Sequence, residues 1–183
     1  VWDTSSLKSL NEMFRGCNEL HFADFKDFDT QNVINMDSMF ADCHEIPSLD
    51  LSSFKTPKLT NMHNIFLACR EMTSLDISNF DTSKVTTMEN AFGGCYSLVK
   101  LDLRNFNTRQ CLNMSYMFSE CKAMVSLELS QNFDTSKVTD MENMFKLCQS
   151  LTSLDLSSFN TANAVLMGNM FNNCTSLTSL DDL

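Results

Sequence analysis

The sequence predicts an α/β repeat solenoid, with one parallel β-sheet face and short helices or helical turns on the opposite face. The first observation is a fixed period: the pair Phe-x-x-Cys recurs at 14–17, 40–43, 66–69, 92–95, 118–121, 145–148 and 171–174. The second is that helix-like and strand-like spacing of apolar residues follow each other within the repeats. A fixed period of roughly 20–50 residues is typical of stacked repeat arrays. We therefore expect residues 1–183 to form a single solenoid of about seven 26-residue rungs.

The first half of each repeat has helical spacing. Val85, Met88, Ala91 and Phe92 recur at intervals of three and four residues, and 138–145 repeat the pattern. Thr86 stands three residues before Glu89, which is the spacing of a capping box. A short helix or helical turn is expected here.

The second half has strand periodicity. Leu98, Leu101 and Leu103 follow the pattern Leu-x-x-Leu-x-Leu, in which the last two leucines alternate with an outward acid. We expect one parallel sheet to stack the central leucine of successive repeats, which are Leu49, Leu75, Leu101, Leu127 and Leu154. One period is a residue longer than the others, and the extra residue near Gln131 predicts a bulge just after the strand.

Large apolar residues fall into columns, meaning equivalent positions of successive repeats. The phenylalanines of the Phe-x-x-Cys pairs form one column, and a second begins at Trp2 and continues with Phe28, Phe54, Phe80, Phe106, Phe133 and Phe159. All 13 methionines occupy three columns at core positions. A methionine-rich chain can indicate soft-metal binding or promiscuous binding, but here we interpret the methionines as core.

Seven of the eight cysteines form one column, and Cys111 stands in a valine column. Zinc sites need clustered ligands, and the sequence contains no C-x-x-C motif. Disulfides between neighbouring rungs are an alternative, since the Cα spacing would be permitted. Because stacked side chains point in parallel, we favour unpaired, buried thiols.

A threonine column runs from Thr4 through Thr30, Thr56, Thr82, Thr108, Thr135 and Thr161. A regular hydroxyl array could bind ice. We favour a structural role, in which the hydroxyls satisfy backbone groups of turns.

Composition and charge exclude some classes of function. The chain is 43% apolar and 20% charged, which is ordinary for a folded protein. Its net charge of −10 disfavours binding to nucleic acid or anionic membrane. No run of apolar residues is long enough for membrane insertion of this segment. Because Val1 begins in mid-repeat, we expect the chain to be a fragment of a longer array.

The candidate binding face is the outward side of the strands, which we expect to be concave, acidic and hydroxyl-rich. Such a face would suit a cationic protein, a glycan or divalent ions, although the sequence has no regular calcium loop. The alternative is a purely solubilising surface, since like charges about 5 Å apart repel. The candidate residues are Asp24, Asp50, Asp76, Asp102, Glu128, Asp155, Asp181, Lys100 and Arg104.

The segments LTSLDLSSFNT and VTDMENMFKLC, with their counterparts in the other repeats, carry a resemblance that covers essentially the whole chain. They resemble the BspA-like leucine-rich-repeat surface proteins of bacteria, which have 26-residue repeats. This resemblance implies a right-handed leucine-rich-repeat solenoid on an extracellular or cell-surface protein, and a role in adhesion or host contact.

We expect a non-enzymatic binding or adhesion module without cofactors. Catalysis needs a unique constellation of groups, whereas a regular array supplies the same groups at every rung. The expected partner is a protein or glycan on another surface, or a neighbouring copy of the chain. The alternative is a structural solenoid that forms a filament, surface layer or spacer by end-to-end stacking.

Overall fold

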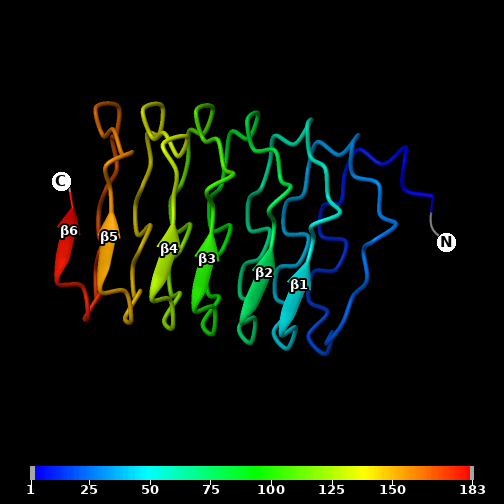
Figure 1. Ribbon diagram of the computed structural model, residues 1–183, viewed down its shortest axis with the longest axis horizontal. Helices are drawn as coiled ribbons and strands as arrows, with labels where there is room; N and C mark the ends of the chain where they lie inside the picture. The colour runs from blue at the N-terminus through cyan, green and yellow to red at the C-terminus, as the bar shows by residue number, and fades with distance from the viewer. Residues whose placement is uncertain (1–2, 182–183) are drawn as a thin grey trace.

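The computed structural model describes residues 3–181 as a single coil of stacked rungs, each rung being one repeat of the chain (Figure 1). Six short strands run parallel, at one per rung: β1 (Ser48–Asp50), β2 (Ser74–Asp76), β3 (Lys100–Asp102), β4 (Ser126–Glu128), β5 (Ser153–Asp155) and β6 (Ser179–Asp181). The repeat solenoid with parallel strands is thus confirmed. Trp2, predicted to begin the second aromatic column, lies outside the described residues.

The strands do not form the one continuous sheet that was predicted. They pair as β1–β2, β3–β4 and β5–β6, and within residues 3–181 no strand pairing joins β2 to β3 or β4 to β5. The central leucines are in register within each pair, as Leu49 is with Leu75 and Leu101 with Leu127. The strand side is therefore a row of three separate parallel pairs.

The opposite side carries a ladder without such breaks. Parallel bridges link successive rungs from the first to the seventh, through Ser9, Asn35, Asn61, Thr87, Asn113, Asp140 and Leu166. We call this the turn side, because the chain that follows each bridge residue is a series of turns. Its backbone, rather than the strands, connects the rungs continuously.

The predicted helices are wrong, since the described residues contain no helix. Asn90 and Gly94 have left-handed backbone, with φ of 53° and 71°, and similar pairs four residues apart recur in the other rungs. Left-handed residues interrupt an α-helix, at about 1–2 kcal/mol each for residues other than glycine. The helical spacing of apolar residues instead reflects consecutive turns.

Hydrogen bonding on the turn side alternates between two partners. The amide of Ala91 donates within its rung to the carbonyl of Met88, at 3.1 Å. The amide of Phe92 donates to the carbonyl of Met117 in the next rung, at 2.9 Å. Since every second amide donates to the neighbouring rung, this segment forms turns within its own rung and also hydrogen-bonds to the next rung.

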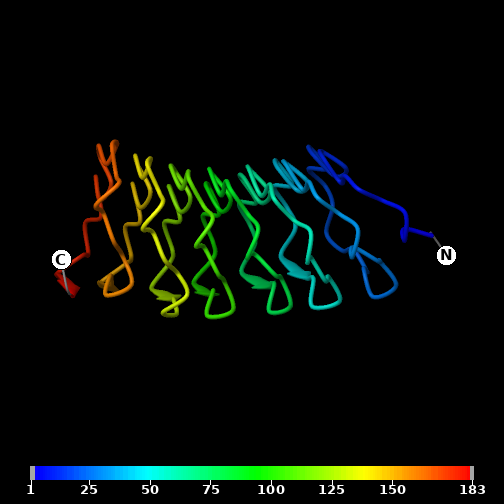
Figure 2. The ribbon, with the colours of Figure 1, turned by 90° about the horizontal axis from the view of Figure 1, so that it is seen from above.

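The rungs lie closer together on the turn side than on the strand side when the array is seen from above (Figure 2). Continuous hydrogen bonding holds the turn side at ladder spacing, whereas breaks between the strand pairs let the rungs spread. The strand side is consequently the broader, outwardly bowed side, and the prediction of a concave strand face is wrong.

The core lies between the two sides and follows the predicted columns. Phe40, Phe66 and Phe92 are fully buried, and successive rings in their column stack with centroids 5.3–5.9 Å apart. Most methionines are fully buried as well, which agrees with their interpretation as core. At the seventh rung Met167 is 40% exposed. Each rung thus buries its apolar face against its neighbours.

Threonine hydroxyls form a second, buried connection between rungs. Thr82 Oγ1 donates to the carbonyl of Asn107 at 3.0 Å and accepts the amide of the same residue at 2.8 Å. The hydroxyls of Thr30, Thr56 and Thr135 likewise bond both the carbonyl and the amide of one residue in the following rung. The column from Thr4 to Thr135 is buried, so it satisfies backbone groups and is not a surface for ice.

All eight cysteines are unpaired. The buried thiols of the Phe-x-x-Cys column donate to the carbonyl of the phenylalanine one rung earlier, for example Cys95 to Phe66 at 3.3 Å and Cys121 to Phe92 at 3.2 Å, whereas Cys111 donates to the carbonyl of Asn113. Burial raises the pKa of Cys121 to about 12. These thiols therefore act as small core residues with a hydrogen-bond donor.

Candidate functional site

The predicted acidic row lies along the strand side. Parallel pairing places Asp50 beside Asp76 and Asp102 beside Glu128, and all four side chains are exposed. Asp155 is paired with Asp181, whose side chain lies outside the description. Asp24 is exposed at the equivalent position of the first rung, which has no strand. The repeat therefore places the predicted carboxylates together on the strand side of the solenoid.

Most carboxylates of this row also hold a turn. Asp50 Oδ1 accepts the amide of Ser52 at 3.0 Å and its hydroxyl at 2.6 Å. Asp76 and Asp155 likewise accept the amide two residues ahead, at 3.0 and 2.8 Å. Such Asx turns satisfy the backbone locally. One carboxylate oxygen is used by the turn, and the other remains available on the surface.

These turn contacts also lower the pKa of two carboxylates of the row, Asp50 and Asp155. The Ser52 hydroxyl and amide hold the pKa of Asp50 below its ordinary value, and the Ser157 hydroxyl and amide do the same for Asp155. Hydrogen bonds to a carboxylate favour its charged form. Asp50 and Asp155 are therefore held in their charged form.

Basic residues interrupt the negative charge at two rungs. The guanidinium of Arg104 donates hydrogen bonds to both carboxylate oxygens of Asp102. Lys26 Nζ lies 3.2 Å from Asp24 Oδ2. Lys100 is exposed at the start of β3. Basic residues therefore interrupt the row in the first rung and at β3, and the strand segments of β1, β2, β4 and β5 carry none.

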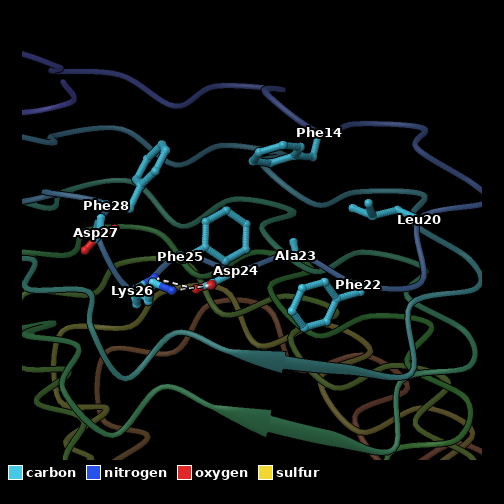
Figure 3. Close-up of a pocket in the computed structure, with 9 residues that line it drawn as sticks. All are labelled: Phe14, Leu20, Phe22, Ala23, Asp24, Phe25, Lys26, Asp27 and Phe28. Carbon is cyan, nitrogen blue, oxygen red and sulfur yellow. Dashed lines mark hydrogen bonds and ion pairs between the residues drawn. The ribbon is translucent and has the colours of Figure 1, made fainter. Parts of the chain in front are cut away.

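An aromatic hollow of about 420 Å³ lies in the first rung (Figure 3). Phe25 is at its centre and makes edge-on contacts with Phe14, Phe28, Phe40 and Phe54, with centroids 5.6–5.7 Å apart. The lining residues are Phe14, Leu20, Phe22, Ala23, Asp24, Phe25, Lys26, Asp27 and Phe28. Four of its nine lining residues are phenylalanines.

The sequence interpretation missed this hollow, although a signal was present. The segment HFADF puts Ala23 where other rungs have a strand leucine, and Phe22 where they have a serine or, in β3, Lys100. Phe22 is 78% exposed. Pro47, at the start of the next strand, lacks the amide that would bond back to the first rung. A small side chain and a missing donor together leave this segment unpaired beside β1.

Neither a metal site nor a membrane span is found in the described part of the chain. Residues 3–181 hold no group of three or more His, Cys, Asp or Glu side chains placed to bind a metal ion. The same residues include no helix of sufficient length and hydrophobicity to cross a bilayer.

Comparisons with known proteins place the repeats in a family. A family model described as "Mycoplasma protein of unknown function, DUF285" matches residues 1–100, 50–131 and 96–182. A leucine-rich cell surface protein from Faecalibacterium prausnitzii is similar in structure, with 14% identity, a TM-score of 0.34, and coverage of 97% of this chain and 70% of that one. No curated protein matches. The family model covers nearly the whole chain, and neither match identifies a ligand.

Proposed function

This chain belongs to the family described as Mycoplasma protein of unknown function, DUF285, and we propose that it is a non-enzymatic binding module displayed at the cell surface. The observation that carries the proposal is the row of exposed carboxylates on the strand side, repeated in register and held by Asx turns. Surface display rests on the resemblance of the repeats to bacterial leucine-rich surface proteins.

Rigid carboxylates favour binding because few side-chain rotations have to be lost on contact. A partner that carries cations or hydroxyl groups at comparable spacing could meet several rungs at once. The proposed partner is therefore a cationic or hydroxyl-rich surface of another protein or glycan.

The test neutralises three neighbouring members of the row, Asp50→Asn, Asp76→Asn and Asp102→Asn. Asparagine keeps an oxygen that can accept the turn amide, so folding should be preserved. Beads coated with the protein are applied to epithelial-cell monolayers at low and physiological salt. We expect the triple variant to bind less than the unaltered protein and to lose the salt dependence of binding.

A matched control exists at another corner of the rung. Asp29, Asp81 and Asp134 accept the amide two residues ahead in the same way, at 2.9, 3.0 and 2.8 Å, but lie beside the threonine column. Changing these three to asparagine removes the same charge and leaves the strand side intact. Equal loss of binding in both triple variants would mean that net charge, rather than the row, matters.

A structural role by end-to-end stacking is the second candidate. Phe14 in the first rung and Phe171 in the seventh stand in the same column, and both are only partly buried. Each stacks on a neighbouring ring, Phe40 at 5.4 Å and Phe145 at 5.5 Å. A second copy could continue the column. Sedimentation velocity across protein concentrations tests this, since stacking requires particles that lengthen with concentration, and a constant monomer contradicts it.

A further inference from the structure

The one repeat that is a residue longer than the others contains a crevice in the middle of the strand side. In regular rungs the turn begins directly after the strand, as shown by the bond from the Phe54 amide to the Leu51 carbonyl at 2.9 Å. After β4 the corresponding bond runs from Phe133 to Ser130, one residue later than the pattern requires. The extra residue lengthens the segment after the strand, where a bulge was expected.

This shift removes contacts that close the other rungs. Ser53 Oγ donates to the carbonyl of Phe25 at 2.9 Å, and Asn105 Nδ2 donates to the carbonyl of Ile77 at 3.1 Å, each to the preceding rung. Asn132 and Ser158 occupy the same column, and neither side chain makes such a bond within residues 3–181. β4 and β5 are also unpaired. Within residues 3–181, neither strand pairing nor a side-chain bond of this column therefore joins β4 to β5.

A cavity of about 540 Å³ fills this gap, within the range of small-ligand sites. It is lined by Leu129, Ser130, Gln131, Asp155, Ser157 and Ser158. Hydroxyl, amide and carboxylate groups converge there from two rungs, and Leu129 adds an apolar patch. Hydroxyls and amides both donate and accept hydrogen bonds, which matches the needs of a ligand rich in hydroxyl groups.

Charge narrows the class of ligand. Asp155 lines the cavity as a carboxylate with a lowered pKa. Glu128, at the end of β4, accepts the Ser126 hydroxyl at 2.9 Å instead of capping the turn. No basic side chain lines the cavity. An anionic ligand would therefore be repelled, whereas a neutral one could donate a hydroxyl to the Asp155 carboxylate that lines the cavity.

We propose that this crevice binds a neutral saccharide unit, and that it is the place on the strand side where the module recognises glycans. The inference rests on the proposed binding function and assigns its ligand class. A regular array offers the same groups at every rung, whereas the longer repeat supplies a polar constellation that the regular rungs lack.

The decisive variant deletes Gln131, which turns LELSQNF into LELSNF and so restores the regular pattern of LDISNF. Binding of glucose, galactose, mannose, N-acetylglucosamine and lactose is measured by saturation-transfer NMR, with sialyllactose as the anionic comparison. We expect the unaltered protein to bind at least one neutral sugar and not sialyllactose. The deletion should weaken that binding by at least about tenfold, because it closes the cavity.

A second pair of variants keeps the test valid if the deletion disturbs folding. Ser157→Ala removes a hydroxyl of the cavity, and Ser78→Ala removes the equivalent hydroxyl of a regular rung. We expect several-fold weaker sugar binding for the first and no change for the second. Absence of sugar binding by the unaltered protein, or equal binding by the cavity variants, overturns the inference. Cell binding that still depends on Asp50, Asp76 and Asp102 would then leave the proposed function standing.

Discussion

The turn side and the strand side consist of the same seven rungs but are connected differently. On the turn side, amides from Met36 to Leu147 cross to the next rung without a missing step, and phenylalanine rings, methionines and thiols pack directly beneath. On the strand side, three-residue strands pair two by two, and their outward residues are polar. The turn side therefore holds the array together, and the strand side is free to vary.

This difference explains where irregularity is tolerated. The extra residue near Gln131, the unpaired first-rung segment and the charge interruption at Arg104 all lie on the strand side. A change there mainly affects one pair of strands, because no strand pairing joins neighbouring pairs within residues 3–181. Five experiments test how unequal the two sides are, from the largest expected effect to the smallest.

High pH should unfold the protein from the turn side. Burial raises the pKa of Cys111 and Cys121 to about 12, from an ordinary value of 9.0. A raised thiol pKa contributes stability that is complete below pH 9 and is lost as pH rises toward 12. At about 1.4 kcal/mol per pKa unit, ionisation of these two thiols on unfolding should lower the free energy of unfolding by roughly 8 kcal/mol at pH 12. Urea unfolding at several alkaline pH values measures the loss.

The control for the thiol effect is Cys111→Val, which introduces the residue found in this column at Val85 and Val138. The variant should remain folded to a higher pH than the unaltered protein. Identical alkaline midpoints would show that buried thiols do not govern the transition.

Core truncation should cost more on the turn side. Phe92 is fully buried between two stacked rings, so Phe92→Ala should lower the free energy of unfolding by about 3–5 kcal/mol. Leu127 on β4 is only partly buried, and Leu127→Ala should cost about 2 kcal/mol or less. Urea titrations compare the two. A larger loss for Leu127 would reverse the assignment of the stabilising side.

Removing one threonine hydroxyl should leave two backbone groups unpaired. Thr82→Val keeps the shape of the side chain but removes the partner of both the amide and the carbonyl of Asn107. We expect a loss of about 1–3 kcal/mol, the penalty for buried unsatisfied groups. Thr86→Val is the control, because its exposed hydroxyl makes only one bond, to Thr60. Similar losses at both sites would contradict a special role for the buried column.

Backbone conformation predicts effects of opposite sign at two neighbouring rungs. Gly94 has φ of 71°, and a Cβ there would lie 3.2 Å from Cα of Ala68. Gly94→Ala should therefore destabilise the fold by about 1–2 kcal/mol. Ala68 has φ of 59° at the equivalent position, so Ala68→Gly should stabilise the fold by up to about 1 kcal/mol. Thermal unfolding of both variants measures the signs, and a stabilising Gly94→Ala would exclude left-handed strain.

The smallest effect is expected on the strand side at low pH. Hydrogen bonds from Ser52 lower the pKa of Asp50, so its contribution is present above the ordinary value of 3.8 and is lost as pH falls below it. Because the side chain is exposed, Asp50→Asn should not measurably change the acid unfolding midpoint. A clear shift of that midpoint would show that the strand-side turns carry more stability than the comparison assigns to them.

The candidate surface was predictable as far as it follows the repeat. A strict period with alternating leucines and acids determines that Asp50, Asp76 and Asp102 point the same way. The aromatic hollow and the polar crevice depend on departures from the period, at Ala23 and Gln131. A departure marks where to look, but the cavity depends on which bonds are lost between rungs.

The sequence by itself determined that the chain is a stacked array, which residues form its columns, and that most of its cysteines and methionines are core. These follow from periodicity, since identical residues must stack on identical residues. Only the tertiary structure decided that Val85 to Cys95 is a ladder of turns instead of a helix, and that the strands pair two by two. Apolar spacing of three and four residues fits either a helix or consecutive turns, and left-handed residues such as Asn90 and Gly94 settle the choice only when the next rung accepts their amides.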